Sequence, residues 1–347
     1  SHSPTFTTPS ASCAITAGSF SRRNSAVSED LPDFAAVVAA AGRLQGRIRR
    51  TPVMRSDRFD ERAGRRVVFK CENLQQGGAF KLRGALNALL ALSPGAGVTR
   101  VATHSSGNHG NALALAARSL GLACTVVVPE GSSRSKVAAI EAAGARVVFC
   151  APGFAAREAA LAGLIAREPA HVVHPFDDCD VIAGQGTAAL ELLSEPMDFD
   201  TLIAPVGGGG LIGGTALAVR GMVDDCTVVA AEPAAADDAW RSFTTGVRVG
   251  CGAPDTIADG LRGSIGARNF ELLRRHVDEV VTVSEAEIVA AMRIVLEDLK
   301  LLIEPSSAVA VAVLLGGRAT RIGGQVGVIL SGGNVDLDQC PFLAGRA

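Results

Sequence analysis

The sequence predicts an α/β fold with two interwoven lobes, in which open, mostly parallel and twisted sheets are covered by helices. Short β-branched runs such as Val67–Phe69 and Thr125–Val128 alternate with Ala- and Leu-rich segments along most of the 347 residues. These runs are apolar throughout, as in strands of a parallel sheet that is buried on both faces. A chain of this length can fill two substantial cores, and no linker separates one half from the other. We therefore expect lobes that exchange segments.

The elements are expected in the following order. A first helix begins near Asp30, which can cap it, has Pro32 in its first turn, and ends at about Gly42. Apolar runs predict strands at Val67–Phe69, Val101–Thr103, Thr125–Val128, Val147–Phe149, Val172–His174, Leu202–Val206, Val228–Ala231 and Val326–Leu330. Helices are expected at Asn111–Leu120, Ser135–Ala143, Ala155–Arg167, Gly184–Leu193, Gly210–Arg220, Ala286–Lys300 and Ser306–Leu315.

Composition excludes several classes of protein. The formal net charge of −2 and the pI near 6.3 do not indicate the excess of basic residues that is typical of a nucleic-acid-binding protein. Every long apolar run is interrupted by Gly or a charged residue, which argues against a membrane span. The eight cysteines are scattered without a C-x-x-C pair, which is typical of a reducing cytoplasm. Residues 1–28 are rich in Ser, Thr and Ala, and we interpret them as a disordered tail, a tag or a leader.

The run Gly77-Gly78-Ala79-Phe80-Lys81-Leu82-Arg83-Gly84 follows the strand expected at Val67–Phe69 and leads into a helix. Lys81 stands beside the aromatic Phe80, and the flanking glycines let backbone and ligand come close. A lysine amine in partly apolar surroundings is easily deprotonated, which suits a Schiff base. Taken alone, the run is equally typical of a surface turn that carries Lys81 and Arg83.

A second loop, His104-Ser105-Ser106-Gly107-Asn108-His109-Gly110, lies between an expected strand and an expected helix. In an open α/β sheet such a loop faces the ligand crevice, and the helix that follows it presents free N–H groups. Ser and Asn side chains together with these N–H groups can hold a carboxylate. The alternative is an ordinary helix cap.

A third loop, Val206-Gly207-Gly208-Gly209-Gly210, also separates a strand from a helix. Four consecutive glycines expose backbone N–H donors, which is what a phosphate group requires. Gly208, Gly210 and Gly213 also satisfy G-x-G-x-x-G, and Glu232 follows the next strand, so a nicotinamide dinucleotide site is a remote alternative.

Two further segments carry polar groups. Glu232 to Asp238 is an acidic loop whose carboxylates and intervening carbonyl could bind Mg²⁺ or Ca²⁺, or could simply be solvated. Ser331 follows the last expected strand and could offer a hydroxyl to a ring nitrogen or start a tight turn.

Taken together, these loops resemble those of the fold-type II pyridoxal-phosphate enzymes, in the serine/threonine dehydratase and serine racemase branch (the tryptophan synthase beta-like superfamily). The resemblance extends from about Leu31 to Leu343. Its markers, in chain order, are Gly78–Gly84, Ser105–His109, Gly184-Gln185-Gly186-Thr187, Gly207–Gly210 and Ser331-Gly332-Gly333-Asn334. It implies a large cofactor-binding domain of residues 29–97 and 178–345 and a small domain of residues 98–177.

The resemblance assigns the cofactor contacts of pyridoxal 5'-phosphate. Lys81 would hold it as an aldimine, and Phe80 would pack against its ring. Asn108 would bond the ring hydroxyl, Gly207 to Gly210 the phosphate, and Ser331 the pyridine nitrogen. Pyridoxal phosphate acidifies the Cα–H of an amino acid, and Lys81 would accept that proton.

The substrate contacts follow from the same resemblance. Ser105, Ser106, Gly107, Asn108 and His109 would bind the substrate carboxylate. Ser106 occupies the place of the acid that reprotonates Cα in the racemases, and hydroxyaspartate dehydratases share this serine.

Three more features come from the resemblance to this branch. Arg157 aligns with an arginine near the substrate mouth of the racemases and could bind a second carboxylate, or be a solvated helix residue. Glu232, the carbonyl of Ala236 and Asp238 match the divalent-cation site of the family, for Mg²⁺, Mn²⁺ or Ca²⁺. Phe176 resembles the dehydratases, because animal racemases tend to have a polar residue there.

The resemblance thus implies a cytoplasmic, homodimeric ammonia-lyase that converts L-serine, L-threonine or a related β-hydroxy amino acid to a 2-oxo acid and ammonia. The alternatives are a serine racemase and a hydroxyaspartate dehydratase. An NAD-dependent dehydrogenase and a non-catalytic ligand-binding protein are more remote.

Overall fold

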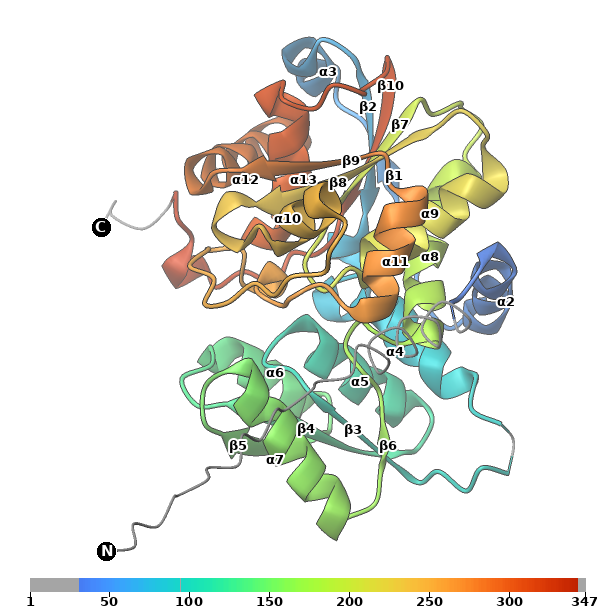
Figure 1. The fold of residues 1–347 in the computed structure, drawn as a ribbon, viewed down its shortest axis with the longest axis vertical. Helices are drawn as coiled ribbons and strands as arrows, with labels where there is room; N and C mark the ends of the chain where they lie inside the picture. The colour runs from blue at the N-terminus through green and yellow to red at the C-terminus, as the bar shows by residue number, and fades with distance from the viewer. Residues whose placement is uncertain (1–30, 94, 343–347) are drawn as a thin grey trace, which may run out of the picture.

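Two sheets, each covered by helices, lie one above the other in the computed structural model (Figure 1). The structure describes residues 31–93 and 95–342. The tail, tag or leader expected at residues 1–28 lies outside the described residues.

The larger sheet has six strands in the order β1-β2-β10-β7-β8-β9. All pairs are parallel except β1, which is antiparallel to β2. The central strands are almost entirely buried, which explains why their sequences are continuous apolar runs. The strands are β1 (Val53–Met54), β2 (Arg66–Cys71), β7 (Thr201–Pro205), β8 (Thr227–Pro233), β9 (Glu279–Val283) and β10 (Gln325–Leu330).

The smaller sheet has four parallel strands in the order β5-β4-β3-β6. All four come from one stretch of chain, whereas the strands of the larger sheet come from both sides of it. The strands are β3 (Arg100–His104), β4 (Ala123–Pro129), β5 (Arg146–Cys150) and β6 (His171–Val172). The chain therefore leaves the first sheet, completes the second and returns.

Helices cover both faces of each sheet. One core of the larger sheet lies beneath α3 (Asp57–Ala63), α12 (Glu285–Leu299) and α13 (Pro305–Gly316). Its opposite core lies beneath α2 (Phe34–Leu44), α8 (Cys179–Leu193), α9 (Gly210–Met222), α10 (Asp238–Thr245) and α11 (Ala267–His276). The smaller sheet packs against α4 (Lys81–Leu90), α5 (Asn108–Ser119) and α6 (Arg134–Ala142) on one face and α7 (Phe154–Arg167) on the other. Short 3₁₀ turns are η1 (Glu72–Leu74), η2 (Gln76–Gly78), η3 (Ala234–Ala236), η4 (Asp259–Leu261) and η5 (Leu337–Gln339).

The α/β fold with mostly parallel sheets is confirmed, with corrections at single elements. The first helix begins at Phe34 and not near Asp30, because the carboxylate of Asp33 accepts the N–H of Ala36 and caps the helix there. Strand β6 ends at Val172 and does not extend to the expected His174. Helix α8 begins at Cys179, five residues before the expected Gly184, and Asp178 caps it.

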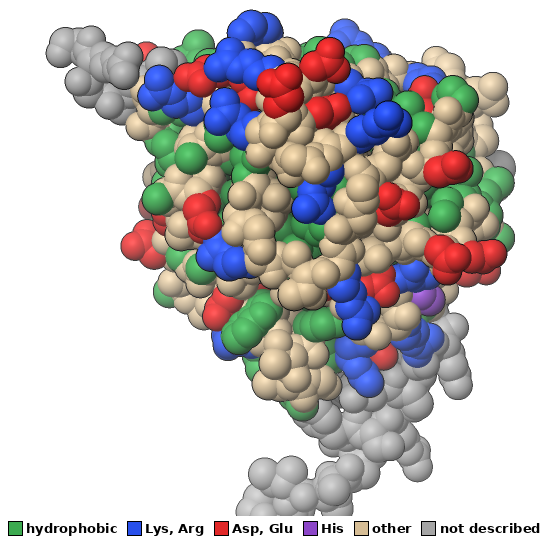
Figure 2. All heavy atoms as spheres, turned by 90° about the horizontal axis from the view of Figure 1, so that it is seen from above, with side chains coloured by type: hydrophobic (Ala, Val, Ile, Leu, Met, Phe, Trp, Pro, Cys, Tyr) green, Lys and Arg blue, Asp and Glu red, His purple; other side chains and the backbone are tan. Residues whose placement is uncertain are grey.

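No described helix is both long enough and apolar enough to cross a membrane. Seen from above, acidic and basic side chains are interspersed on the face that Figure 2 shows. This face carries no broad patch of one sign of charge.

Candidate active site

A pocket of about 700 Å³ lies where the carboxyl ends of the two sheets face each other. Strands β3, β7 and β10 end at it, and α4, α5, α9 and α13 begin there. Most of the site residues expected from sequence line this pocket, namely Phe80, Lys81, Ser105, Ser106, Gly107, Asn108, His109, Arg157, Gly207, Gly208, Gly209, Gly210 and Ser331. Glu232, Ala236 and Asp238 do not.

Lys81 is the first residue of α4 and projects into the pocket. Its Nζ donates to the carbonyl of Pro175 at 2.9 Å and lies 5.0 Å from the centre of the Phe80 ring. Burial lowers the pKa of Lys81 to about 8, although the Glu304 carboxylate opposes this shift. A primary amine that loses its proton near neutral pH is a competent nucleophile and base.

The loop before Lys81 is held against the loop after β10. The N–H of Phe80 donates to the carbonyl of Ser331 at 3.0 Å, and the N–H of Gly333 donates to the carbonyl of Gly78 at 2.9 Å. Ser331 is 2% exposed and lines the pocket. These backbone bonds set Lys81 and Ser331 against the same cavity, although 250 positions separate them in the sequence.

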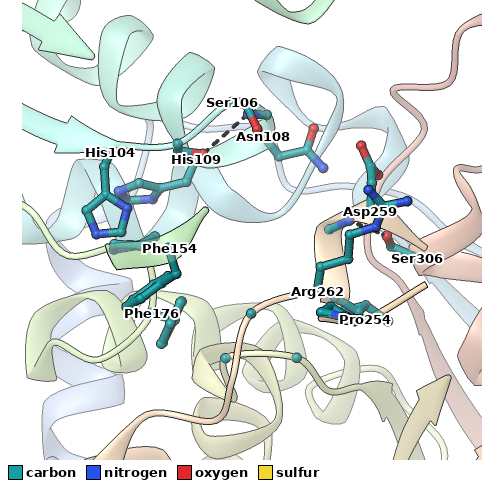
Figure 3. Close-up of a pocket in the computed structure, with 18 of the residues that line it drawn as sticks. His104, Ser106, Asn108, His109, Phe154, Phe176, Pro254, Asp259, Arg262 and Ser306 are labelled. Atoms are coloured by element: carbon teal, nitrogen blue, oxygen red, sulfur yellow. Dashed lines mark hydrogen bonds between the residues drawn. The ribbon is translucent and has the colours of Figure 1, made fainter. Parts of the chain in front are cut away.

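The Ser105–His109 segment forms the start of α5. Gly107 is the N-cap, and its N–H donates to the Ser105 hydroxyl at 3.3 Å. Ser105 and Ser106 are half-buried and line the pocket, and Figure 3 shows Ser106 there. The first N–H groups of a helix have no partners within it, so this end of α5 can receive an anion.

His109 differs from its neighbours in that loop. Its ring is 2% exposed, and Nε2 lies 3.3 Å from the carbonyl of Val173. Because a carbonyl can only accept, Nε2 carries the proton. Burial lowers the pKa of His109 well below its usual value, so the ring is neutral.

The glycine loop at 207–210 leaves no room for side chains. A Cβ on Gly208 would lie 2.2 Å from the Phe176 ring, and one on Gly207 would lie 2.8 Å from the Cα of Leu261. Gly209, the N-cap of α9, has a φ of 93°, which favours glycine. Bare backbone N–H groups at the start of a 13-residue helix therefore face the pocket.

Arg157 projects from α7 into the pocket and is half-buried. Its guanidinium lies over the ring of Phe154 at 5.4 Å, and its buried Nε has no hydrogen-bond partner among the described residues. Burial lowers the pKa of Arg157 somewhat from its usual value. His104 and Phe176 also line the pocket on this side (Figure 3). Edge-on ring contacts connect Phe154 to His104, His104 to His174 behind the wall, and His174 to Phe176.

The three expected cation ligands lie together outside the pocket. Both oxygens of Glu232 accept backbone N–H groups of α10, from Ala239 at 2.8 Å and Trp240 at 2.7 Å. Asp238 is fully buried; its Oδ2 accepts the N–H of Ile265, and its Oδ1 has no partner among the described residues. Within residues 31–93 and 95–342, no group of three His, Cys, Asp or Glu side chains is arranged to hold a metal. The position of Glu232 also removes it as an acid for a ribose in the glycine loop.

Several pocket residues were not found from sequence. Glu304, the N-cap of α13, is 2% exposed and lines the pocket beside Asn108. Lys136 of α6 pairs with Asp259 of η4 at the wall that Figure 3 shows opposite His104 and Phe154. Lys136 follows the run Gly131-Ser132-Ser133, a sequence signal that could have pointed to it, whereas Glu304 lies in none of the glycine-rich loops singled out from the sequence. Long-range packing brings both residues to the pocket.

The comparisons with known proteins agree with this geometry. A family model described as "Pyridoxal-phosphate dependent enzyme" matches residues 44–332. The chain is 42% identical over 312 residues to the beta-hydroxyaspartate dehydratase of Paracoccus denitrificans, which covers 90% of this chain and 99% of the relative. It is 44% identical over 299 residues to the serine racemase of Dictyostelium discoideum, which covers 85% of this chain and 92% of the relative.

Among solved structures, maize serine racemase superposes with a TM-score of 0.86 at 37% identity, covering 89% of this chain and 95% of that one. The resemblance predicted from the sequence motifs is thereby confirmed. The chain belongs to the family of pyridoxal-phosphate dependent enzymes, in the group with fold type II that contains the serine dehydratases and serine racemases.

Proposed function

We propose that this enzyme is an ammonia-lyase that dehydrates 3-hydroxyaspartate to a 2-oxo acid and ammonia. The observation that carries the choice of substrate is the guanidinium of Arg157 in the pocket, whose buried Nε has no hydrogen-bond partner among the described residues. Serine and threonine have one carboxylate, whereas 3-hydroxyaspartate has a second one that such a guanidinium can bind.

The pocket residues fit pyridoxal 5'-phosphate. The side-chain-free Gly207–Gly210 loop and the start of α9 offer N–H donors to its phosphate. Lys81 offers an amine of lowered pKa to its aldehyde, and the buried Ser331 lines the same pocket. When bound, the cofactor supplies an electron sink that acidifies the Cα–H of an amino acid.

Lys81 Nζ then serves as the base that accepts the Cα proton. With a pKa of about 8, a useful fraction of the amine is neutral at physiological pH, and the protonated form is also available for return. The β-hydroxyl group leaves from the same substrate, which is the step that makes the reaction a dehydration.

The two carboxylates of the substrate bind to different groups, one to the N-terminus of α5 and the other to Arg157. The α-carboxylate binds at the Ser105–Asn108 end of α5, where free N–H groups and hydroxyls gather. The β-carboxylate binds Arg157, which the Phe154 ring holds from the other side.

The test is a panel of β-hydroxy amino acids assayed for 2-oxo acid with wild-type enzyme and Arg157→Met. We expect kcat/KM for 3-hydroxyaspartate to fall about 100-fold, or about 3 kcal/mol, in the variant, because a partly desolvated charge pair is lost. The value for serine should stay nearly unchanged. Arg167→Met, at an exposed position in the last turn of α7, is the matched control. An equal loss for both substrates would refute the assignment.

Serine racemisation is a second candidate function, favoured by the half-buried Ser106 hydroxyl at the pocket. A serine there can return a proton to Cα from a different wall than Lys81. Ser106→Ala should then remove D-serine formation and leave 2-oxo acid formation intact. D-serine formation that survives the change would exclude this role.

A divalent cation, Mg²⁺, Mn²⁺ or Ca²⁺, is proposed at Glu232, the carbonyl of Ala236 and Asp238. Buried carboxylates and a carbonyl are suitable ligands, and the orphaned Oδ1 of Asp238 fits such an ion. Chelation should lower the melting temperature of the wild type but not of Asp238→Asn. If the wild type has the same melting temperature with and without chelator, the loop has a purely structural role.

We also propose a homodimer in the cytoplasm. The buried free thiols of Cys71, Cys124 and Cys226 support a reducing compartment. Light scattering of the purified enzyme tests the dimer, and a monomeric mass would refute it.

A further inference from the structure

Glu304 is a buried acid that the proposed reaction leaves without a role. It caps α13, and its N–H donates to the carbonyl of Gly332 at 3.0 Å. Its Oε1 accepts the side-chain N–H of Asn108 at 2.8 Å, and its Oε2 has no hydrogen-bond partner among the described residues. A carboxylate that is 2% exposed and only half satisfied is costly to maintain, so a function is expected for it.

Glu304 ends a chain of hydrogen bonds whose direction is determined by a backbone carbonyl. The carbonyl of Gly77 can only accept, so the group of Asn334 that meets it at 2.7 Å is Nδ2. The same Nδ2 donates to Asn108 at 2.9 Å, which must present Oδ1 to it. Asn108 therefore turns Nδ2 toward Glu304.

Two glycines make room for this chain. A Cβ on Gly78 would lie 2.3 Å from Oδ1 of Asn334, and one on Gly332 would lie 2.6 Å from Oε1 of Glu304. Gly78 also has a φ of 75°, which favours glycine. The two loops that flank Lys81 contain Gly78 and Gly332. Each glycine leaves the space that one end of the hydrogen-bond network occupies.

We propose that Glu304 is a positioning residue of the cofactor site. With Asn334 it orients the Asn108 amide so that only N–H donors are available to a ligand, and its negative charge favours the protonated form of the Lys81 amine. The inference rests on the proposed roles of Asn108 and Lys81.

The donor character of Asn108 has a chemical consequence. One hydrogen on Nδ2 is used by Glu304, and the other is available to an oxygen in the pocket. A donor stabilises an ionised ring oxygen over a protonated hydroxyl. The network therefore selects the ionised form of the cofactor's ring hydroxyl.

The charges around Glu304 and Lys81 are on several elements. Lys136 of α6 attracts Glu304 and Asp259 of η4 repels it, while burial, the largest effect, raises the pKa of Glu304 to about 7. Around Lys81 lie Glu304, which raises its pKa, and the two rings of His109 and His174, whose lowered pKa keeps them neutral. Above about pH 7, where its carboxyl is ionised, Glu304 is thus the anion that acts on the Lys81 amine.

The experiment follows the uptake of pyridoxal 5'-phosphate by cofactor-free protein. The rate of chromophore formation is measured against pH, the dissociation constant is measured by titration, and borohydride reduction followed by peptide mapping locates the label. Because the neutral amine reacts, the rate rises with pH through the pKa of Lys81. The variants are Glu304→Gln, Glu304→Leu and Asn334→Ala, with Glu168→Gln at a partly exposed ion pair as the control.

We expect the pH midpoint of uptake to move to lower pH in both Glu304 variants, because the amine loses its neighbouring anion. It should not move in Asn334→Ala or Glu168→Gln. Glu304→Gln keeps an acceptor for Asn108 and should hold the cofactor within about threefold of wild type, whereas Glu304→Leu and Asn334→Ala should bind it at least about tenfold more weakly.

An unshifted midpoint in Glu304→Gln overturns the effect of its charge on Lys81. Equal cofactor affinity in Glu304→Gln and Asn334→Ala overturns the positioning of Asn108, and this comparison does not depend on the folding of Glu304→Leu. A label on a residue other than Lys81 in the wild type would overturn the proposed function itself, and with it this inference.

Discussion

His104 ends β3 in the pocket wall and shows how one buried ring ties stability to pH. It is 4% exposed, its ring packs edge-on against Phe154 and His174, and its Nδ1 has no partner among the described residues. Burial first, then the nearby His174 and Arg157, lowers the pKa of His104 to about 4. Below about pH 6.5 the unfolded chain takes up a proton there that the folded protein does not.

The stability that depends on neutral His104 is therefore complete above pH 6.5 and lost as the pH falls toward 4. Between pH 7 and pH 4.5, the free energy of unfolding should fall in both proteins. We expect the fall to be smaller in His104→Phe than in the wild type, by on the order of 2 kcal/mol. Urea denaturation at the two pH values measures this difference within each protein, so any overall effect of the substitution cancels. The same acid loss in both proteins would contradict the prediction.

At the scale of elements, α4 is held in place by a buried network of charges. Arg83 is fully buried and binds Glu72 of η1 at 2.7 Å and Glu191 of α8 at 2.8 Å. Lys70 of β2, also buried, binds Glu191 at 2.6 Å. The interpretation of Arg83 as part of a surface turn is therefore wrong, and the residue instead connects the helix that begins with Lys81 to η1 and α8.

Removing one member of this network should be costly, because its partner would remain buried and charged. We expect Arg83→Met to lower the free energy of unfolding by about 3–5 kcal/mol. Arg293→Met, which breaks an exposed pair with Glu297, should change it by less than about 1 kcal/mol. Chemical denaturation measures the free energy of unfolding of both variants. A loss in Arg83→Met as small as the loss in Arg293→Met would show that the network tolerates the removal of Arg83.

The sequence could predict an element where residues close together in the chain determine its structure. Glycine runs at loops are local, so the sequence could point to the Gly207–Gly210 loop and the Lys81 loop, both of which line the pocket. Gly184 was taken as the start of a helix, but it lies inside α8, where its missing side chain lets Gly84 of α4 approach: a Cβ there would lie 2.6 Å from the Cα of Gly84. Helix α11 does not stand out in the sequence because only a few of its residues are apolar, and strand β9 does not because Glu279 and Thr282 interrupt its apolar pattern. Glu304 reaches the site through tertiary packing alone.

At the scale of the whole molecule, we propose that residues 29–97 with 178–345 and residues 98–177 form a large and a small domain that close around the substrate. Each sheet has cores of its own beneath its own helices, and the pocket lies between the carboxyl ends of the two sheets. Closing such a pocket excludes water and completes the contacts to the substrate.

The ion pair between Lys136 of α6 and Asp259 of η4 crosses the pocket from one proposed domain to the other. The two side chains are 19% and 41% exposed, so the pair contributes no more than about 1 kcal/mol to folding. Its effect on closure should appear in substrate binding, because the two residues belong to different proposed domains and both line the pocket. We expect Lys136→Met to raise KM for the preferred β-hydroxy amino acid about fivefold, which corresponds to about 1 kcal/mol, with little change in the free energy of unfolding.

Steady-state kinetics and urea denaturation measure the two quantities on the same preparations. Arg146→Met is the matched control, because it breaks the pair of Arg146 with Glu168 inside the small domain. An unchanged KM in Lys136→Met, or an equal rise in both variants, would show that the pair does not take part in closure. A rise confined to Lys136→Met would identify this contact as one that the two domains form when they close on the substrate.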